Sequence, residues 1–257
     1  MIAVEFRLKL SSAYSIRVPY SYQCARTYPL PAPSTIKGLC ANALWRKDGG
    51  NPVELMKNIH DASLGATARA KHPIAVSACT VRVVPQNALL RQFAFTPYVD
   101  CMIIFKDGHE VMAHGIKESL KVSPVYLGDS ESLVCIIPET VNTVTDIAEV
   151  SEDASVTVNS LFRFDFIKEK EIDNRGVVLY MQDDPCATDA VLERYMAPLR
   201  QVGDSYEPLD SITFVSAKKG FWVKGALLQC VISENSQEAP AEKKRITRSK
   251  KVKHANV

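Results

Sequence analysis

The sequence lacks the usual marks of several protein classes. Its 257 residues contain seven cysteines, an odd number, and no Cys-x-x-Cys pair. We therefore expect reduced core thiols, without disulfides or a zinc site. The longest apolar runs, such as residues 101–105, are far too short to span a membrane, and the N-terminus has no signal-peptide pattern. These features predict a cytoplasmic protein with no membrane contact.

Signature motifs of common enzymes are also missing. The sequence has no P-loop, Gly-x-Gly-x-x-Gly, Gly-x-Ser-x-Gly or His-Glu-x-x-His pattern. His109 and His114, with two lysines nearby, are the one constellation suited to acid–base chemistry, although two surface histidines at a helix N-terminus give the same pattern. The acidic pair before Pro185 is typical of a turn. We expect no catalytic residue, cofactor or metal.

The first 44 residues are strongly patterned. Residues 1–10 alternate apolar and polar side chains without a fault, which predicts a half-buried strand. Residues 28–44 then join a proline-rich approach to a helix, with Ser34 as the predicted N-cap and apolar side chains at the spacing of one helical face. A sharp corner between loop and helix follows from this pattern.

This opening and a second motif resemble the Cas-five family of CRISPR-associated proteins, in the RAMP superfamily. The first motif is the strand, a tyrosine-rich loop and the helix that begins with PLPAPSTIKGL at residues 29–39. The second, PVYLGDSE at residues 124–131, is similar to the family's P-x-Y-L-G-x-S-E turn. The resemblance covers about residues 1–140 and looks most like the archaeal type I-A branch.

Further elements complete a recognisable order in residues 1–140. We predict a short helix at 52–59, a strand at 98–106, a helix at 111–121 and a strand at 133–137. The order is that of a βαββαβ ferredoxin-like (RRM-like) α+β domain. The resemblance implies that an insertion at about residues 66–95 forms a β-hairpin thumb.

The rest of the chain divides by composition. Residues 141–160 are polar and acidic and read as a linker or long turn. Residues 161–233 predict a C-terminal β-rich α+β region, which forms either a second domain or one unit with the first. The elements expected there are strands at 161–167, 176–181, 211–217 and 221–232 and a helix at about 188–199. Residues 234–257 predict a disordered basic tail.

Charge is segregated along the chain although the net charge is only +2. Residues 1–128 contain 15 Lys and Arg against 8 Asp and Glu, whereas residues 129–233 contain 9 against 18. A basic surface attracts phosphates, and an acidic one repels nucleic acid and faces solvent or a basic partner. We therefore expect any RNA contact in the N-terminal half.

The first helix offers the best-motivated phosphate site. We expect backbone amides at Thr35, Ile36 and Lys37 to point outward there, with Ser34 and Thr35 hydroxyls, the Lys37 charge and close approach at Gly38. Ordinary capping is the structural alternative. The remaining candidate RNA-binding residues are Arg17, Tyr20, Tyr22 and Arg26 in the adjoining loop, for base stacking and phosphate contacts, and Arg69, Lys71, His72, Arg82 and Arg91 in the thumb.

The resemblance implies a non-catalytic RNA-binding subunit of a type I CRISPR interference complex, Cascade. Such a subunit holds the 5′ handle of the CRISPR RNA, contacts the backbone and large subunits, and meets target DNA indirectly through the guide. One alternative is a metal-independent endoribonuclease that processes CRISPR repeat RNA with His109 and His114. Another is a ferredoxin-like protein-interaction scaffold that binds no RNA.

Overall fold

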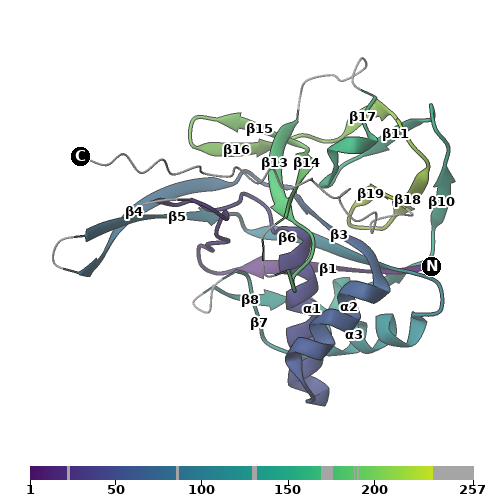
Figure 1. The fold of residues 1–257 in the computed structure, drawn as a ribbon, viewed down its shortest axis with the longest axis horizontal. Coiled ribbons are helices and arrows are strands. Elements are labelled where there is room, and N and C mark those ends of the chain that lie inside the picture. The colour runs from purple at the N-terminus through teal and green to yellow at the C-terminus, as the bar shows by residue number, and fades with distance from the viewer. Residues whose placement is uncertain are drawn as a thin grey trace, which may run out of the picture.

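The computed structural model describes residues 1–21, 24–84, 87–128, 132–168, 176–187, 189 and 191–233, and for residues 81–84 and 87–89 it describes the backbone alone. The chain is a mixed α+β protein in three layers, with helices below a central sheet and a β-rich region above it (Figure 1). The predicted tail, 234–257, lies outside the described residues.

The middle layer is a six-stranded antiparallel sheet. Its strands follow the order β3-β6-β1-β8-β7, and β9 also pairs with β1. The strands are β1 (Ile2–Leu10), β3 (Ser63–Ala70), β6 (Tyr98–Phe105), β7 (Val125–Tyr126), β8 (Leu133–Ile136) and β9 (Asn142–Val144). The strands predicted at 1–10, 98–106 and 133–137 are confirmed.

Helices cover one face of this sheet. They are α1 (Pro33–Asp48), α2 (Pro52–Ala62) and α3 (Glu110–Val122), and two short 3-10 helices, η1 (Pro138–Thr140) and η2 (Phe164–Phe166), occur elsewhere. The three predicted helices of residues 1–140 are confirmed. Along the chain, α1 and α2 lie between β1 and β3, and α3 lies between β6 and β8. None of the described helices is long and apolar enough to cross a membrane.

Helix α1 begins two residues before the predicted position. Ala32 is the N-cap, no side chain caps the helix, and Pro33 occupies the first turn, so the prediction of Ser34 as N-cap is wrong. The physical reason is that proline lacks an N–H and has its φ preset for the first helical position. Thr35 and Ser34 therefore carry first-turn amides without an intrahelical acceptor.

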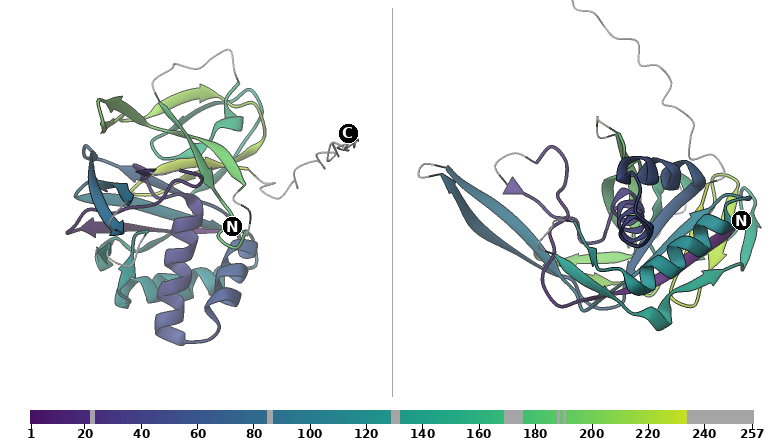
Figure 2. Two further views of the ribbon diagram at one scale, coloured as in Figure 1. Left: turned by 60° about the vertical axis from the view of Figure 1, so that its left-hand side comes forward. Right: turned by 90° about the horizontal axis from the view of Figure 1, so that it is seen from below.

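A long hairpin protrudes from the sheet, as Figure 2 shows most clearly in its right-hand view. It consists of β4 (Ala75–Val84) and β5 (Asn87–Phe95), and β2 (Cys24–Ala25) pairs in parallel with β5. The predicted start of this insertion at residue 66 is wrong, because β3 belongs to the central sheet and pairs with β6. The SLGATARA segment has small residues of weak β propensity, and packing on both faces makes it a strand.

The described residues of the C-terminal region form four small sheets. Their strands are β10 (Ile147–Val150), β18 (Gly220–Lys224) and β19 (Gln229–Ile232); β11 (Ser155–Val158) and β17 (Ile212–Val215); β12 (Phe162–Arg163), β14 (Leu192–Ala197) and β13 (Val177–Gln182); and β15 (Leu199–Val202) and β16 (Ser205–Pro208). The strands predicted at 176–181 and 211–217 are confirmed, and residues 221–232 form a hairpin.

Three predictions for this region are wrong. Residues 141–160 are not a linker, because they contain β9, β10 and β11, each paired with a strand distant in sequence. The helix expected at 188–199 is instead β14 and the start of β15, because β14 pairs along its whole length with β13. The strand expected at 161–167 is cut short by η2. Pairing with other strands overrides the local pattern in the first two cases.

Some of the cysteines are not buried, although all seven were expected to be core thiols. Cys40, Cys101 and Cys230 are buried core thiols, and burial raises the pKa of Cys40 and Cys230 to about 12. Three others, Cys79, Cys135 and Cys186, are exposed, so the prediction of core thiols is wrong for them.

Strand β1 is buried on both faces, although its alternation predicts one solvent face. Its polar residue Glu5 is only 1% exposed, since the C-terminal region covers that side of the sheet. The Glu5 carboxylate accepts hydrogen bonds from the backbone amides of Ala226 (3.1 Å) and Leu227 (3.0 Å). Burial raises the pKa of Glu5 more than these two hydrogen bonds lower it. Glu5 thus ties the central sheet to the turn between β18 and β19.

We predict that Glu5→Ala lowers the free energy of unfolding by about 1–3 kcal/mol, because two buried amides lose their acceptor. Urea unfolding measures the change. Lys9→Ala, at the exposed end of the same strand, is the control and should change stability by less than about 0.5 kcal/mol. Equal effects of the two substitutions would show that Glu5 does not hold the turn.

Candidate nucleic-acid interface

A cavity of about 620 Å³ lies where helix α1, the loop before it and the protruding hairpin meet. We call it the α1 cavity. Its polar and aromatic lining comes from four segments distant in sequence, namely Ser15 and Arg17, Thr35 and Asn42, Arg91, and Tyr126. The two motifs singled out in the sequence, the helix corner and the Pro-x-Tyr-Leu-Gly turn, therefore form walls of one cavity.

The described parts of the loop before α1, residues 11–21 and 24–32, are held at the cavity by several hydrogen bonds. The Tyr14 backbone pairs with Ala94 of β5, and the buried Tyr14 hydroxyl donates to the Pro29 carbonyl at 2.5 Å. The Ile16 amide donates to the Thr27 hydroxyl at 3.0 Å. These bonds fix the loop against the base of the hairpin, and the side chains of Arg17 and Arg26 are left exposed.

Gly128 of the second motif closes one wall by tight packing. Its φ is +91°, and an added Cβ would collide with the Ser15 carbonyl oxygen and with the Ile16 side chain. Only glycine combines this backbone conformation with such a close approach. The turn therefore requires glycine for a structural reason.

Gly38 is the opposite case. It lies within helix α1 on the cavity wall, and an added Cβ would meet nothing within 4 Å. Packing does not account for this glycine, and its φ is not in the left-handed region. A glycine within a helix costs about 0.5–1 kcal/mol relative to alanine. What Gly38 provides is open space beside the helix backbone.

Two guanidinium groups and the start of α1 make the cavity electropositive. The Arg91 Nε donates to the Ser15 hydroxyl at 3.4 Å, and its guanidinium lies 5.0 Å from the Phe93 ring centroid. Arg17 is exposed at the rim. Because first-turn amides and guanidinium groups both bind phosphate, the arrangement suits a phosphodiester with an adjacent base.

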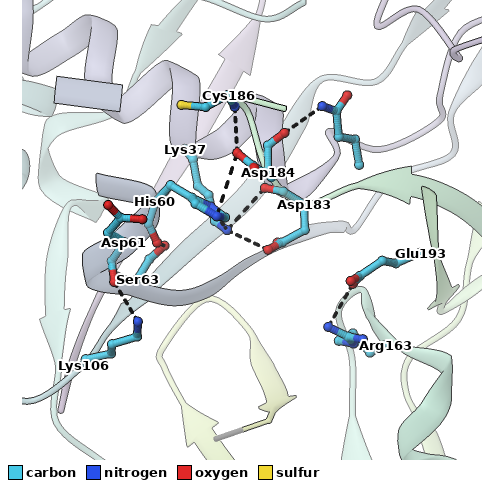
Figure 3. A network of polar contacts seen from close by, with 11 residues as sticks. Lys37, His60, Asp61, Ser63, Lys106, Arg163, Asp183, Asp184, Cys186 and Glu193 are labelled. Carbon is cyan, nitrogen blue, oxygen red and sulfur yellow. Dashed lines mark hydrogen bonds and ion pairs between the residues drawn. The ribbon is translucent and has the colours of Figure 1, made fainter. Parts of the chain in front are cut away.

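Lys37 lies elsewhere, and its prediction as a phosphate ligand is wrong. Its side chain is 1% exposed and its Nζ forms an ion pair with the Asp183 carboxylate at 2.9 Å (Figure 3). The amide of Ile36 donates to the Ala32 carbonyl at 3.1 Å, so the outward amides expected at 36 and 37 are also wrong. Lys37 lies four residues after buried Pro33, and that spacing is the signal that sequence reasoning missed.

A small polar network surrounds this ion pair. The Lys37 Nζ lies 3.2 Å from the His60 Nδ1, and the His60 Nε2 lies 3.8 Å from an Asp184 oxygen. Burial, and then the Lys37 charge, lower the pKa of His60, so its ring is neutral at pH 7 and accepts from Lys37. Asp184 accepts from the Cys186 amide at 2.7 Å, which confirms the turn predicted for this acidic pair. The network joins α1 and α2 to the segment after β13.

The predicted thumb residues divide between the hairpin and its base. Arg91 lines the α1 cavity. Arg69 lies on β3 and donates to the Leu227 carbonyl at 3.3 Å, and burial lowers its pKa. Its guanidinium thus contacts the C-terminal region, and its role as an RNA contact stays a prediction. Exposed Lys71 lies 3.8 Å from the Asp100 carboxylate. His72 is exposed, with its ring 5.8 Å from that of Tyr98.

The remaining predicted RNA-binding residues lie outside the cavity, at its edge or outside the described residues. Tyr20 is 76% exposed with φ of 60°, and it does not line the cavity. Tyr22 and the side chain of Arg82 lie outside the described residues. Ser34 and Thr35 are partly exposed at the start of α1, and Thr35 lines the cavity.

The two histidines of the enzyme alternative lie on α3. His109 is the N-cap and makes no capping hydrogen bond with its side chain, and His114 is exposed. Neither lines the α1 cavity. Within the described residues, no group of three or more metal-ligating side chains gathers.

Comparisons with known proteins bear on the same region. Residues 4–92 match the family model described as CRISPR-associated protein (Cas_Cas5). A solved CRISPR protein from Archaeoglobus fulgidus has a similar fold, with a TM-score of 0.57 and 14% identity over 91% of this chain and 99% of that one. A chain from a CRISPR RNA-guided surveillance complex gives a TM-score of 0.43 and 16% identity, over 83% of this chain and 91% of that one. No curated protein matches the chain.

We predict that the two glycines of the cavity respond oppositely to alanine. Gly38→Ala should raise the free energy of unfolding by about 0.5–1 kcal/mol, because alanine has the higher helix propensity and its Cβ displaces no atom. Gly128→Ala should lower it by more than about 1 kcal/mol, through its positive φ and its collision with the loop. Urea unfolding measures both, and a loss of stability in Gly38→Ala would indicate a packing role instead.

We predict that Lys37→Met costs about 3 kcal/mol of stability, because it leaves the Asp183 carboxylate without its partner. In an Asp183→Asn background the same substitution should cost markedly less. Lys121→Met is the control, since Lys121 pairs with Glu118 on the surface and should change stability by less than about 1 kcal/mol. The same cost for Lys37→Met in both backgrounds would contradict a coupled pair.

Proposed function

We propose that this chain, a member of the Cas-five family of CRISPR-associated proteins, is a non-catalytic RNA-binding subunit of a type I CRISPR interference complex and holds the 5′ handle of the CRISPR RNA in the α1 cavity. The observation that carries the proposal is Gly38, which leaves open space on a cavity wall where packing does not require it. The family match includes Gly38, Arg17 and Arg91.

The chemistry of the cavity fits a nucleotide. Its volume of about 620 Å³ is in the range of small-ligand pockets. Arg17 and Arg91 supply cationic donors for phosphate, and the Thr35 hydroxyl and amide add neutral donors. The Tyr126 ring offers a surface for a base, and Gly38 lets a sugar or base approach the helix.

The rest of the fold suits assembly with other subunits. The order β1-α1-β3-β6-α3-β8, with strands arranged β3-β6-β1-β8, is the basis on which we assign a ferredoxin-like domain with the β4–β5 hairpin as its thumb. We propose that the thumb contacts the backbone subunit and lies across the guide duplex. The acidic residues 129–233 suit the large subunit or solvent better than RNA. In this proposal the protein contacts target DNA only indirectly, through the guide RNA. The complex belongs to the type I-A branch and acts in the cytoplasm.

A binding role fits the cavity better than an endoribonuclease role. Cleavage without a metal needs an acid and a base beside the 2′-hydroxyl and the leaving oxygen. Among the residues that the structure describes, those that line the α1 cavity include no histidine or carboxylate. We therefore propose that the cavity binds RNA and does not cleave it.

We predict a salt-sensitive shift of end-labelled repeat RNA that the double variant Arg17→Glu, Arg91→Glu weakens at least tenfold, without metal and with the RNA left intact. If both arginines contact phosphate, the slope of log affinity against log salt should become shallower by about 1.4. Gly38→Ala, which changes no charge, should also weaken binding.

The control is Arg200→Glu, which changes the charge of an exposed arginine on the β15–β16 hairpin, away from the cavity. It should leave the shift nearly unchanged. Discrete cleavage within the repeat would instead indicate the processing enzyme. Absence of any shift, even with co-purifying subunits, would favour the scaffold alternative.

A further inference from the structure

The α1 cavity does not end at the start of the helix. Thr35, Gly38, Asn42, Arg46 and Gly49 follow one another at spacings of three or four residues, so they lie along one face of α1. At the far end of this face is a second cavity of about 520 Å³. We call it the Trp45 cavity, and it is lined by Trp45, Arg46, Lys47, Gly49, Val122 and Pro124 among others.

Arg46 connects the two cavities. Its Nε donates to the Asn42 side-chain oxygen at 2.9 Å, and its guanidinium lies 5.4 Å from the Tyr126 ring centroid. Asn42 and Tyr126 both line the α1 cavity, whereas Arg46 lines the second one. A polar and aromatic surface thus runs without a break from one cavity to the other.

We propose that the Trp45 cavity is a second RNA subsite, in which a base of the strand that leaves the α1 cavity stacks on the Trp45 indole. This inference rests on the function proposed above and extends it to the other end of α1. The path from Thr35 to Gly49 is about 21 Å long at the helical rise. About six nucleotides at a stacked spacing of roughly 3.4 Å span that distance.

Trp45 has the properties of a stacking surface. Its side chain is 38% exposed, and next to it Val122 is 70% exposed. Every base has a π-face, so stacking on an aromatic side chain tolerates any sequence.

The charges nearby favour a base over a phosphate at this position. Arg46 and Lys47 lie in the last turn of α1, where cations offset the negative end of the helix. Asp48 and Glu118 are also close in sequence to the cavity, and Glu118 is already paired with Lys121 at 2.7 Å. The balance is mildly positive, which permits a nucleic-acid strand without clamping its phosphates.

A protein partner fits this surface less well than RNA. The buried centres of protein interfaces are depleted of lysine, although arginine is enriched there. Here Lys47 lines the cavity itself. The Trp45 cavity is also continuous with the α1 cavity through Arg46. This continuity is a second reason to propose that one RNA strand occupies both cavities.

The experiment uses the intrinsic fluorescence of the full chain. The protein has two tryptophans, and Trp222→Phe leaves Trp45 as the only one. Repeat RNA should quench Trp45 fluorescence at the concentrations that give the gel shift. Repeat RNAs shortened step by step should lose this quenching before they lose binding, because the α1 cavity fills first.

Affinity gives the second readout. Trp45→Ala should weaken binding of the full repeat RNA at least fivefold, whereas Trp45→Phe should retain most of it. Tyr180→Ala, which removes another exposed aromatic ring on β13, is the matched control and should have no effect.

The outcomes separate this inference from the proposed function. If repeat RNA binds in a manner sensitive to Arg17 and Arg91 but Trp45 is neither quenched nor required, the second subsite is wrong and the first stands. If no variant or condition gives binding, the proposed function fails with it. A Trp45→Ala variant that binds RNA normally but no longer assembles with co-purifying subunits would overturn the inference in favour of a protein contact.

Discussion

The ion pair between Lys37 and Asp183 determines how helix α1 is presented. Lys37 reaches from the inner side of α1 to the segment after β13, and His60 of α2 completes the contact. A buried ammonium group is stable only with such partners. The pair therefore ties the helix, which packs on the central sheet, to the C-terminal region as well. With its inner side fixed, α1 presents the face that contains Gly38 and Asn42 to the cavity.

The two glycines of the cavity show how one residue type serves two purposes. Gly128 is required by the backbone, because its φ is positive and the Ser15 carbonyl leaves no room for a side chain. Neither the backbone conformation nor the packing requires glycine at position 38, and Gly38 weakens the helix in which it lies. A position that costs stability without a packing reason is one where function explains the residue better than folding does.

Sequence reasoning predicted the N-terminal half well because its signals are local. The alternation in residues 1–10 and the helical spacing in residues 36–44 both correspond to elements of the structure, β1 and α1. It failed where tertiary contacts decide. Strand β3 has alanines and a glycine where a strand usually has branched side chains, and β14 looks helical until its pairing with β13 is known.

The candidate site was predictable in part for the same reason. Thr35, Gly38 and Arg91 were named from the sequence and meet in the cavity, together with Arg17. Tyr126 and Gly128 lay in a quoted motif, but nothing local places that turn beside the loop. Lys37 was misjudged because a lysine usually faces solvent, and its partner Asp183 is distant in sequence.

Ultraviolet crosslinking of repeat RNA that carries 4-thiouridine, followed by mass spectrometry of the peptides, locates the bound RNA on the protein. We expect crosslinks in the loop before α1 and in α1 itself, in the Arg91 segment of β5 and around Tyr126. Crosslinks confined to residues 142–233, or none in a sample that binds RNA, would contradict a binding site in the α1 cavity.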